Sequence, residues 1–150
     1  MRTRGVPVRF FVLPILGGLA LLSGCGGSAA WGRNQLATVE INSAAIEDLD
    51  LIVVPNEGGP DATVACSESY IGFDCGRLIG PDFTQIRFTT SSQASQHPYR
   101  VYVRNNGSRT RRVWLDVYFD NKPNYSYGFD VYAGETRWAA VVRRNNAGIR

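Results

Sequence analysis

The segment from Arg112 to Asp120 alternates between apolar and polar side chains, and no other feature of the chain restricts its fold so strongly. Successive side chains of a β-strand point to opposite faces of a sheet, so an alternating segment has one apolar and one polar face. The apolar set is Val113, Leu115, Val117 and Phe119. The segment therefore predicts a strand whose apolar face lies against a core.

Six further segments show the same alternation or a run of β-branched residues, and turn-forming residues separate most of them. They are residues 38–42, 49–54, 85–89, 99–104, 127–132 and 136–143. Asn105-Asn106-Gly107 is a strong turn signal, and Lys122-Pro123-Asn124 is expected to end the strand before it. From residue 38 onward, only residues 43–49 approach a helical period. About seven strands predict an all-β fold, an antiparallel Ig-like β-sandwich.

The same alternation selects the side chains that should meet inside the sandwich. They are Val39, Ile41, Leu51, Val53, Ile86, Phe88, Val101, Val103, Val113, Leu115, Val117, Phe119, Phe129, Val131, Trp138 and Val142. Burial of each larger side chain contributes about 1.5–3 kcal/mol to stability.

The first 25 residues have a different composition. Arg2, Arg4 and Arg9 precede an apolar run of 13 residues, Phe10–Leu22, and small residues lead from this run to Cys25. The run is too short for a membrane-spanning helix, which needs about 20 residues. A positive start, an apolar middle and small residues are typical of a secretory leader. An ordinary cleaved signal and a short buried helix are the alternatives.

Leu22-Ser23-Gly24-Cys25 resembles the lipobox of bacterial lipoproteins. This resemblance implies that the signal peptide, residues 1–24, is removed and that Cys25 carries the lipid that anchors the protein to the membrane. Residues 25–37 are then a flexible tether, and residues 38–150 form the β-sandwich domain. Gly26, rather than Asp, after the lipidated cysteine implies sorting to the outer membrane in a two-membraned cell, facing the periplasm or the cell surface.

Three cysteines occur in the chain. If lipid occupies Cys25, Cys66 and Cys75 remain, and a disulfide between them is expected in an oxidising compartment. Both lie within residues 55–82, which are rich in Gly and Pro and are expected to be irregular. A metal or redox site is disfavoured because the spacing is not Cys-x-x-Cys and His97 is the only histidine.

Acidic and basic residues are segregated along the chain. Residues 25–86 contain nine acidic and two basic residues, whereas residues 87–150 contain four acidic and eleven basic residues. In one interpretation the two halves face each other within one sandwich and partly neutralise each other. In the other, a basic face binds an anionic partner such as lipid A phosphates, lipoteichoic acid or an acidic glycan.

Four aromatic side chains are expected to point away from the core, with three arginines beside them. The aromatic residues are Tyr102, Trp114, Tyr118 and Tyr132, and the arginines are Arg100, Arg104 and Arg112. Exposed together on adjacent strands, they would form a flat face that binds sugars or the edge of a protein. The alternative is that some strands face the other way and that the aromatic residues reflect strand propensity alone.

Residues 103–107, 113–120 and 133–136 together resemble the CARDB and related Ig-like adhesion modules. The shared pattern is a strand, an Asn-x-Gly turn, a long alternating strand and Ala-Gly-Glu before the last strand. The match covers residues 99–142, and it implies an Ig-like fold and a binding role without catalytic residues.

The residues that could carry catalysis form no recognisable motif. His97 lies in a Ser/Gln-rich turn, and Glu47, Asp48 and Asp50 lack the ordered spacing of a calcium loop. No cofactor, metal or nucleic acid is therefore expected. The sequence predicts a non-enzymatic envelope lipoprotein that binds a protein partner or assists an assembly. The first alternative is a module that binds a glycan or an anionic polymer, and the second is an envelope enzyme or an Ig-like protease inhibitor.

Overall fold

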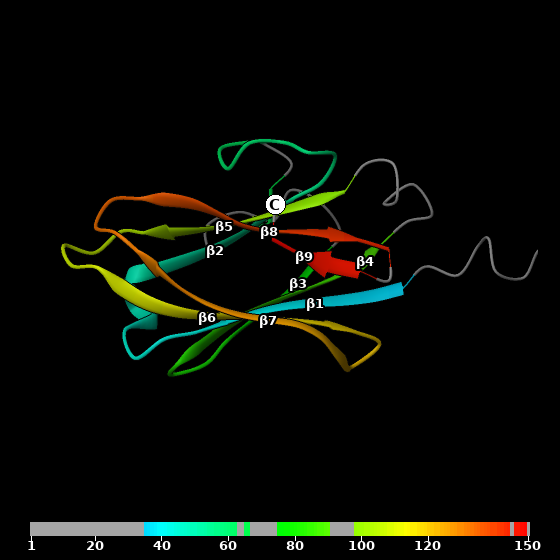
Figure 1. Ribbon diagram of the computed structural model, residues 1–150, viewed down its shortest axis with the longest axis horizontal. Helices are drawn as coiled ribbons and strands as arrows, with labels where there is room; N and C mark the ends of the chain where they lie inside the picture. The colour runs from blue at the N-terminus through cyan, green and yellow to red at the C-terminus, as the bar shows by residue number, and fades with distance from the viewer. Residues whose placement is uncertain (1–34, 63–64, 67–74, 91–97, 145, 150) are drawn as a thin grey trace, which may run out of the picture.

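The computed structural model describes residues 35–62, 65–66, 75–90, 98–144 and 146–149, which form two antiparallel sheets packed face to face (Figure 1). The prediction of an all-β sandwich is thereby confirmed. The described residues contain nine strands rather than about seven.

One sheet has five strands in the order β3-β4-β1-β6-β7. Their bounds are β3 Cys75–Ile79, β4 Phe83–Thr90, β1 Gln35–Asn42, β6 Arg111–Phe119 and β7 Lys122–Val131. The strand β1 begins at Gln35, so Leu36 and Ala37, which the sequence assigned to the tether, belong to this sheet.

The other sheet has four strands in the order β2-β5-β8-β9. Their bounds are β2 Leu49–Val54, β5 Tyr99–Asn105, β8 Thr136–Arg143 and β9 Asn146–Gly148. A single 3-10 turn, η1 Ile46–Asp48, carries the chain from β1 in the first sheet to β2 in the second. It accounts for the weak helical period of residues 43–49.

The core between the sheets contains every side chain of the predicted inward set except Trp138. Trp138 is half-buried and packs with Tyr102 on the outer side of the four-stranded sheet. The cause is a bulge, because Val101 pairs with Ala140 while the next residue, Tyr102, pairs with Trp138. The bulge places both Ala139 and Ala140 in the core, so the residue before them, Trp138, points outward instead of inward.

The turn after β6 also differs from the sequence prediction. Asp120 and Asn121 have φ values of 50° and 63°, the left-handed conformation of a tight hairpin turn. The next strand therefore begins at Lys122, where a break was predicted, and Pro123 lies within β7. Because β7 is the edge of its sheet, a residue without an N–H group is tolerated there.

A disulfide joins Cys66 to Cys75, as predicted, and it connects the two sheets. Cys66 exchanges two backbone hydrogen bonds of 2.8 Å with Val53 in β2, whereas Cys75 begins β3 in the five-stranded sheet. The bond thus links β3, an edge strand, to the sheet on the opposite side of the core.

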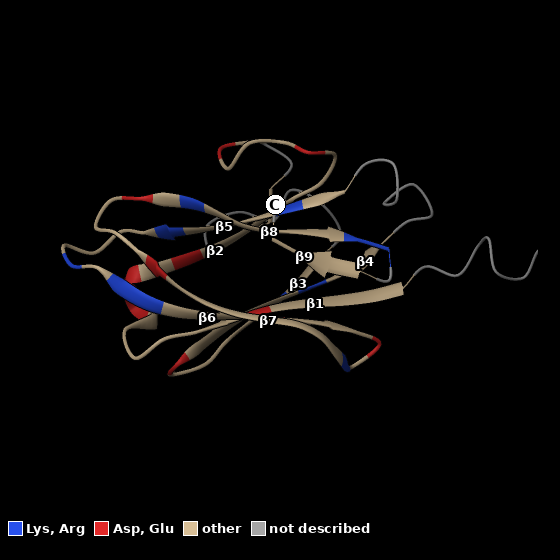
Figure 2. Cartoon of the chain, in the orientation of Figure 1, with Lys and Arg blue, Asp and Glu red and all other residues tan. Residues whose placement is uncertain are grey.

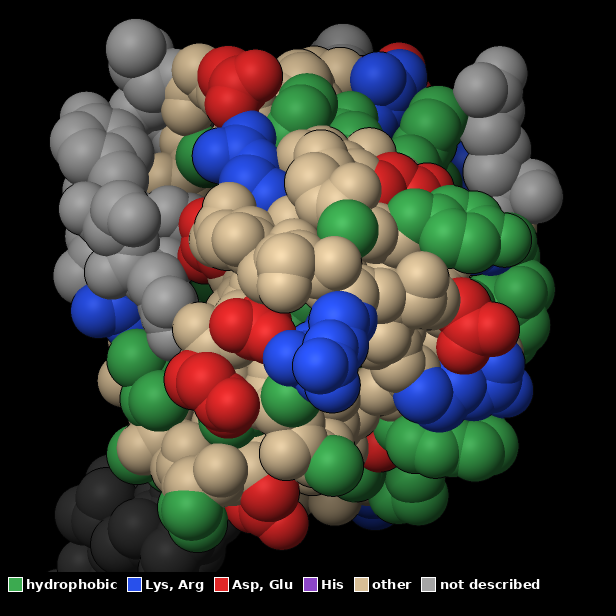
Figure 3. Space-filling view, turned by 90° about the vertical axis from the view of Figure 1, so that its left-hand side faces the viewer, with side chains coloured by type: hydrophobic (Ala, Val, Ile, Leu, Met, Phe, Trp, Pro, Cys, Tyr) green, Lys and Arg blue, Asp and Glu red, His purple; other side chains and the backbone are tan. Residues whose placement is uncertain are grey.

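Three of the four ion pairs among the described residues join an acidic residue of the first half of the chain to an arginine of the second half. These pairs are Glu57–Arg100, Asp61–Arg104 and Asp48–Arg111. Figure 2 shows the acidic positions of η1 and β2 beside the basic start of β6, and Figure 3 shows oppositely charged side chains adjacent at this end of the molecule. These three pairs partly neutralise the segregated charges across the fold, in agreement with the first interpretation.

Candidate functional site

An open groove of about 550 Å³ lies at one end of the five-stranded sheet. Its walls come from three segments: the turn that leaves β1, the turn between β3 and β4, and the first residues of β6. The lining residues are Asn42, Ser43, Ala44, Ala45, Asp82, Thr110, Arg111, Arg112 and Trp114. This volume is within the range of about 300–1,000 Å³ found for small-molecule sites.

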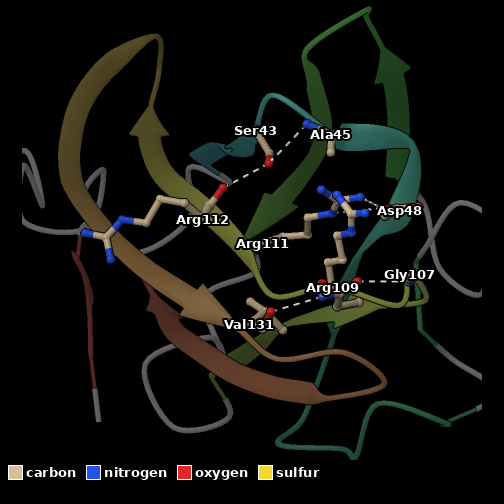
Figure 4. Close-up of polar contacts among 9 residues, drawn as sticks. Ser43, Ala45, Asp48, Gly107, Arg109, Arg111, Arg112 and Val131 are labelled. Atoms are coloured by element: carbon tan, nitrogen blue, oxygen red, sulfur yellow. Dashed lines mark hydrogen bonds and ion pairs between the residues drawn. The ribbon is translucent and has the colours of Figure 1, made fainter.

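Ser43 holds the three walls of this groove together, and Figure 4 shows its bonds to Arg112 and Ala45. Its hydroxyl donates to the carbonyl of Arg112 over 2.9 Å, and its backbone N–H donates to the carbonyl of Asp82 over 3.0 Å. The same hydroxyl accepts from the N–H of Ala45 over 3.4 Å. The walls are therefore fixed relative to one another.

Arg111 and Arg112 point to opposite sides of β6 (Figure 4). Arg111 donates through Nε, over 2.8 Å, and through an Nη to Asp48, and both side chains are half-buried. Arg112 is exposed and donates to Asp130 over 3.1 Å. Of the two, the Arg112 guanidinium lies over the indole of Trp114, with 5.6 Å between its Cζ and the ring centroid.

Trp114 is 52% exposed and packs flat against the neighbouring strand β7. A Cβ placed on Gly128, its partner in the register, would lie 2.7, 2.9 and 3.0 Å from three atoms of the six-membered ring. Three nearly equal distances mean that the flat side of the ring, rather than its edge, covers Gly128. The exposed surface of the residue is therefore mostly on the opposite side of the ring.

A row of polar side chains continues from the groove across the outer face of the five-stranded sheet. Gln85 donates to Glu40 over 2.8 Å, and Asn42 donates to Glu40 over 3.0 Å and to Asp116 over 3.4 Å. Tyr118 lies on the same face, and its burial, followed by the negative charges of Asp116 and Glu40, raises its pKa above 10.0.

The seven residues of the predicted binding face do not form one surface. Arg112, Trp114 and Tyr118 lie on the five-stranded sheet, whereas Arg100, Tyr102 and Arg104 lie on the four-stranded sheet across the core. The remaining residue, Tyr132, is 64% exposed in the turn after β7.

The expectation that Tyr102 is exposed is wrong, because the segment after β2 covers it. Tyr102 points away from the core, as its register predicted, but only 7% of its surface is accessible. It packs against Ile52, Val54 and Ala65, and its hydroxyl donates to the carbonyl of Gly58 over 3.0 Å.

Beside Tyr102, a second groove of about 470 Å³ lies on the four-stranded sheet. Arg100 lies over the Trp138 ring, 4.5 Å from its centroid, and pairs with Glu57 at 3.4 Å. Arg104 pairs with Asp61 and donates to the Thr136 hydroxyl over 3.0 Å. These arginines are thus engaged with protein groups.

The edge strand β3 pairs only with β4 among the described strands. Its two apolar side chains are exposed, Leu78 by 53% and Ile79 by 50%. An edge strand presents unpaired backbone groups along its outer side. This strand was not predicted from the sequence, although the two apolar residues between Gly76 and Gly80 were a signal for a short one.

Cys25 and His97 lie outside the described residues. Within the described part of the chain, no group of three potential ligands is arranged to hold a metal ion. Of the acidic cluster weighed for catalysis, Asp48 pairs with Arg111, Asp50 is buried and Glu47 is exposed. No helix among the described residues has the length and apolar character needed to span a bilayer.

Asn42, Ser43 and Asp82 are groove residues that sequence analysis did not single out. Short polar residues in turns carry little sequence signal, since most of them are only solvated. Comparisons with protein-family models, with curated proteins and with solved structures gave no match for this chain.

Proposed function

We propose that this protein is a lipid-anchored, non-enzymatic module of the cell envelope that binds a protein partner by strand addition at β3. The observation that carries the proposal is the exposed edge, where Leu78 and Ile79 stand beside backbone groups that no described strand pairs. An extended segment of a partner can add to such an edge through main-chain hydrogen bonds, while its side chains cover exposed apolar groups.

Two features of the edge support this mode of binding. Proteins commonly protect edge strands with charges or proline; β3 has one charged residue, Arg77, but the two exposed apolar residues Leu78 and Ile79 follow it directly. In addition, the disulfide at Cys75 anchors the start of β3 to the opposite sheet. A fixed edge loses less conformational freedom on binding than a mobile one.

The anchor is proposed from Leu22-Ser23-Gly24-Cys25, whose order resembles the lipobox. One acyl chain holds a protein only marginally, and each further buried methylene contributes about 0.8 kcal/mol, so several chains on Cys25 would hold it firmly. The residues between Cys25 and Gln35, where β1 begins, would serve as the tether. The resemblance of the C-terminal half to Ig-like adhesion modules supports a binding role.

The partner site is tested by photo-crosslinking in the cell of origin. A benzophenone amino acid at Leu78 should give one reproducible adduct. In a separate variant without the photo-crosslinker, Leu78→Lys should abolish co-purification of that partner with the protein. The same amino acid at Tyr132, an equally exposed position away from β3, is the matched control. Equal adducts from both positions, or recovery unchanged by Leu78→Lys, would refute strand addition at β3.

The anchor is tested separately from the partner. Labelled palmitate should attach to the wild-type protein and not to Cys25→Ser, which should also leave the membrane fraction. Unlabelled wild-type protein, or membrane association that survives the substitution, would contradict the anchor without bearing on the β3 site.

Binding of a glycan is a second candidate function, and the groove beside Trp114 favours it. The face first predicted for this role is divided between two sheets, and three of its arginines are already paired with carboxylates. A surviving glycan site would therefore be smaller and less basic than the sequence indicated.

A further inference from the structure

We infer that the groove beside Trp114 binds an uncharged oligosaccharide and that a pyranose ring stacks on the indole of Trp114. This inference rests on the second candidate function and names the ligand class of its site. It is independent of the β3 edge, since Leu78 and Ile79 do not line the groove.

Trp114 supplies a flat apolar surface of the right kind. One side of its ring lies against Gly128, 52% of the residue is exposed, and the Arg112 guanidinium over the ring has its Cζ 5.6 Å from the centroid. A pyranose has an apolar face of C–H groups, and a large aromatic ring that is held flat can cover that face at little entropic cost. Gly128 allows the flat position, because any side chain there would occupy the space of the ring.

The groove also supplies hydrogen-bonding groups for sugar hydroxyls. The amide oxygen of Asn42 and the carboxylate of Asp82 can accept, and the Arg112 guanidinium can donate. Asp82 forms no side-chain hydrogen bond or ion pair with any other residue that the structure describes. A sugar hydroxyl both donates and accepts, so this mixture suits it better than a site of one polarity.

The backbone of the groove walls and the Arg112 guanidinium are held in place before any ligand arrives. Ser43 bonds to the Asp82 and Arg112 carbonyls, while Asp130 holds the Arg112 guanidinium over 3.1 Å. Positions fixed in advance reduce the conformational cost of binding.

The local charge favours an uncharged ligand over an anionic one. The carboxylates in or beside this site are those of Glu40, Asp48, Asp82, Asp116 and Asp130, and the cations are the guanidiniums of Arg87, Arg111 and Arg112. Arg111 is paired with Asp48 and Arg112 with Asp130. The carboxylates therefore outnumber the cations, and a polyanion would be repelled rather than attracted.

The ligand extends beyond one sugar because Tyr118 lies on the same face of β6, four residues after Trp114. At about 3.3 Å per residue, the two aromatic residues are about 13 Å apart. Glu40 and Asp116 pair directly across β1 and β6 in the space between them. An oligosaccharide that runs along β6 would thus contact both aromatic residues and the polar row.

The test is calorimetric titration of the full-length protein in detergent with cellotetraose, chitotetraose and mannotetraose. At least one should bind saturably, and Trp114→Ala should lower its affinity by about tenfold or more. Trp114→Phe should fall between the two. Because Trp114→Ala also uncovers Gly128, Asp82→Ala is the second variant, and it should weaken binding by about threefold to tenfold without altering the sheet.

Tyr132→Ala is the matched control, since it removes an equally exposed aromatic residue outside the groove. Its affinity should stay within about twofold of the wild type. Three results would overturn the inference: no binding of any of the three oligosaccharides, tighter binding of heparin than of the best one, or wild-type affinity in both groove variants. None of these would affect the crosslink from Leu78.

Discussion

Replacement of Asn105 by alanine should destabilise the protein more than its place at a strand end suggests. Asn105 is fully buried at the last position of β5. Its amide nitrogen donates to the carbonyl of Arg109 over 2.8 Å and to that of Val131 over 3.0 Å. Its amide oxygen accepts from the N–H of Gly107 over 2.9 Å. One side chain therefore joins β5 and its turn to the end of β7 in the opposite sheet.

The expected loss follows from these three bonds. Each contributes about 0.5–1.5 kcal/mol net, and a buried group left without a partner costs a further about 1–3 kcal/mol. Arg109 is exposed and Gly107 half-buried, so water can replace the amide there, whereas Val131 is fully buried. We expect Asn105→Ala to lower the free energy of unfolding by about 3–4 kcal/mol. This loss is a large share of the free energy of unfolding of a typical domain, which is about 5–15 kcal/mol.

Urea unfolding followed by tryptophan fluorescence measures this loss, provided that the m-value, the slope of the unfolding free energy against urea concentration, is the same in the variant and the wild type. Asn106→Ala, at the exposed neighbouring position, should change the free energy by about 0.5 kcal/mol or less. Asn105→Asp keeps the acceptor but brings a carboxylate to the two carbonyls, so it should cost at least as much as alanine. A loss below about 1 kcal/mol for Asn105→Ala would refute the role of this side chain in joining the sheets.

Two further predictions concern the disulfide and the outer face. The Cys66→Ser/Cys75→Ser double variant should lose about 2.6 kcal/mol of unfolding free energy, because the bond closes a loop with a sequence separation of 9. Reduction of the wild type should give a similar loss in the same urea assay, and no difference between the oxidised and reduced protein would contradict the estimate from loop entropy. The raised pKa of Tyr118 means that folding favours its protonated phenol. The stability that this protonated phenol contributes is therefore complete below pH 10.0 and is lost as the pH rises through the folded-state pKa. The Tyr118→Phe variant has no titrating phenol at this position, so it should lack this pH dependence. Unfolding titrations at alkaline pH compare the two proteins, and identical pH profiles would count against the shift.

Local pattern was sufficient to predict most of the core and the strands. Alternation over Arg112–Asp120 and similar segments determines which side chains share a face, since the period of a strand is a property of the backbone itself. The predicted disulfide was also correct. Its prediction followed from the number of cysteines together with two expectations, that Cys25 carries lipid and that the compartment is oxidising. Trp138 was misplaced because a bulge adds one residue to the count, and a bulge depends on the pairing of two strands.

The candidate site could be predicted only in part. Trp114 and Tyr118 were correctly assigned to an outward face of β6, but the sequence could not place Asn42 and Asp82 beside them. Those residues reach the groove through the order β3-β4-β1-β6-β7, which puts strands distant along the chain next to one another.

The sequence by itself determined a β-sandwich, all of its predicted inward side chains except Trp138, and its cysteine pair, because these depend mainly on local pattern along the chain. Only the tertiary structure decided that Arg100 and Tyr102 lie across the core from Trp114, and that Gly58 and its neighbours cover Tyr102. Alternation tells which residues share one face of a strand, but not which sheet the strand joins or what packs over it. Those choices depend on contacts between segments far apart in the chain, where the free energy of burial is gained.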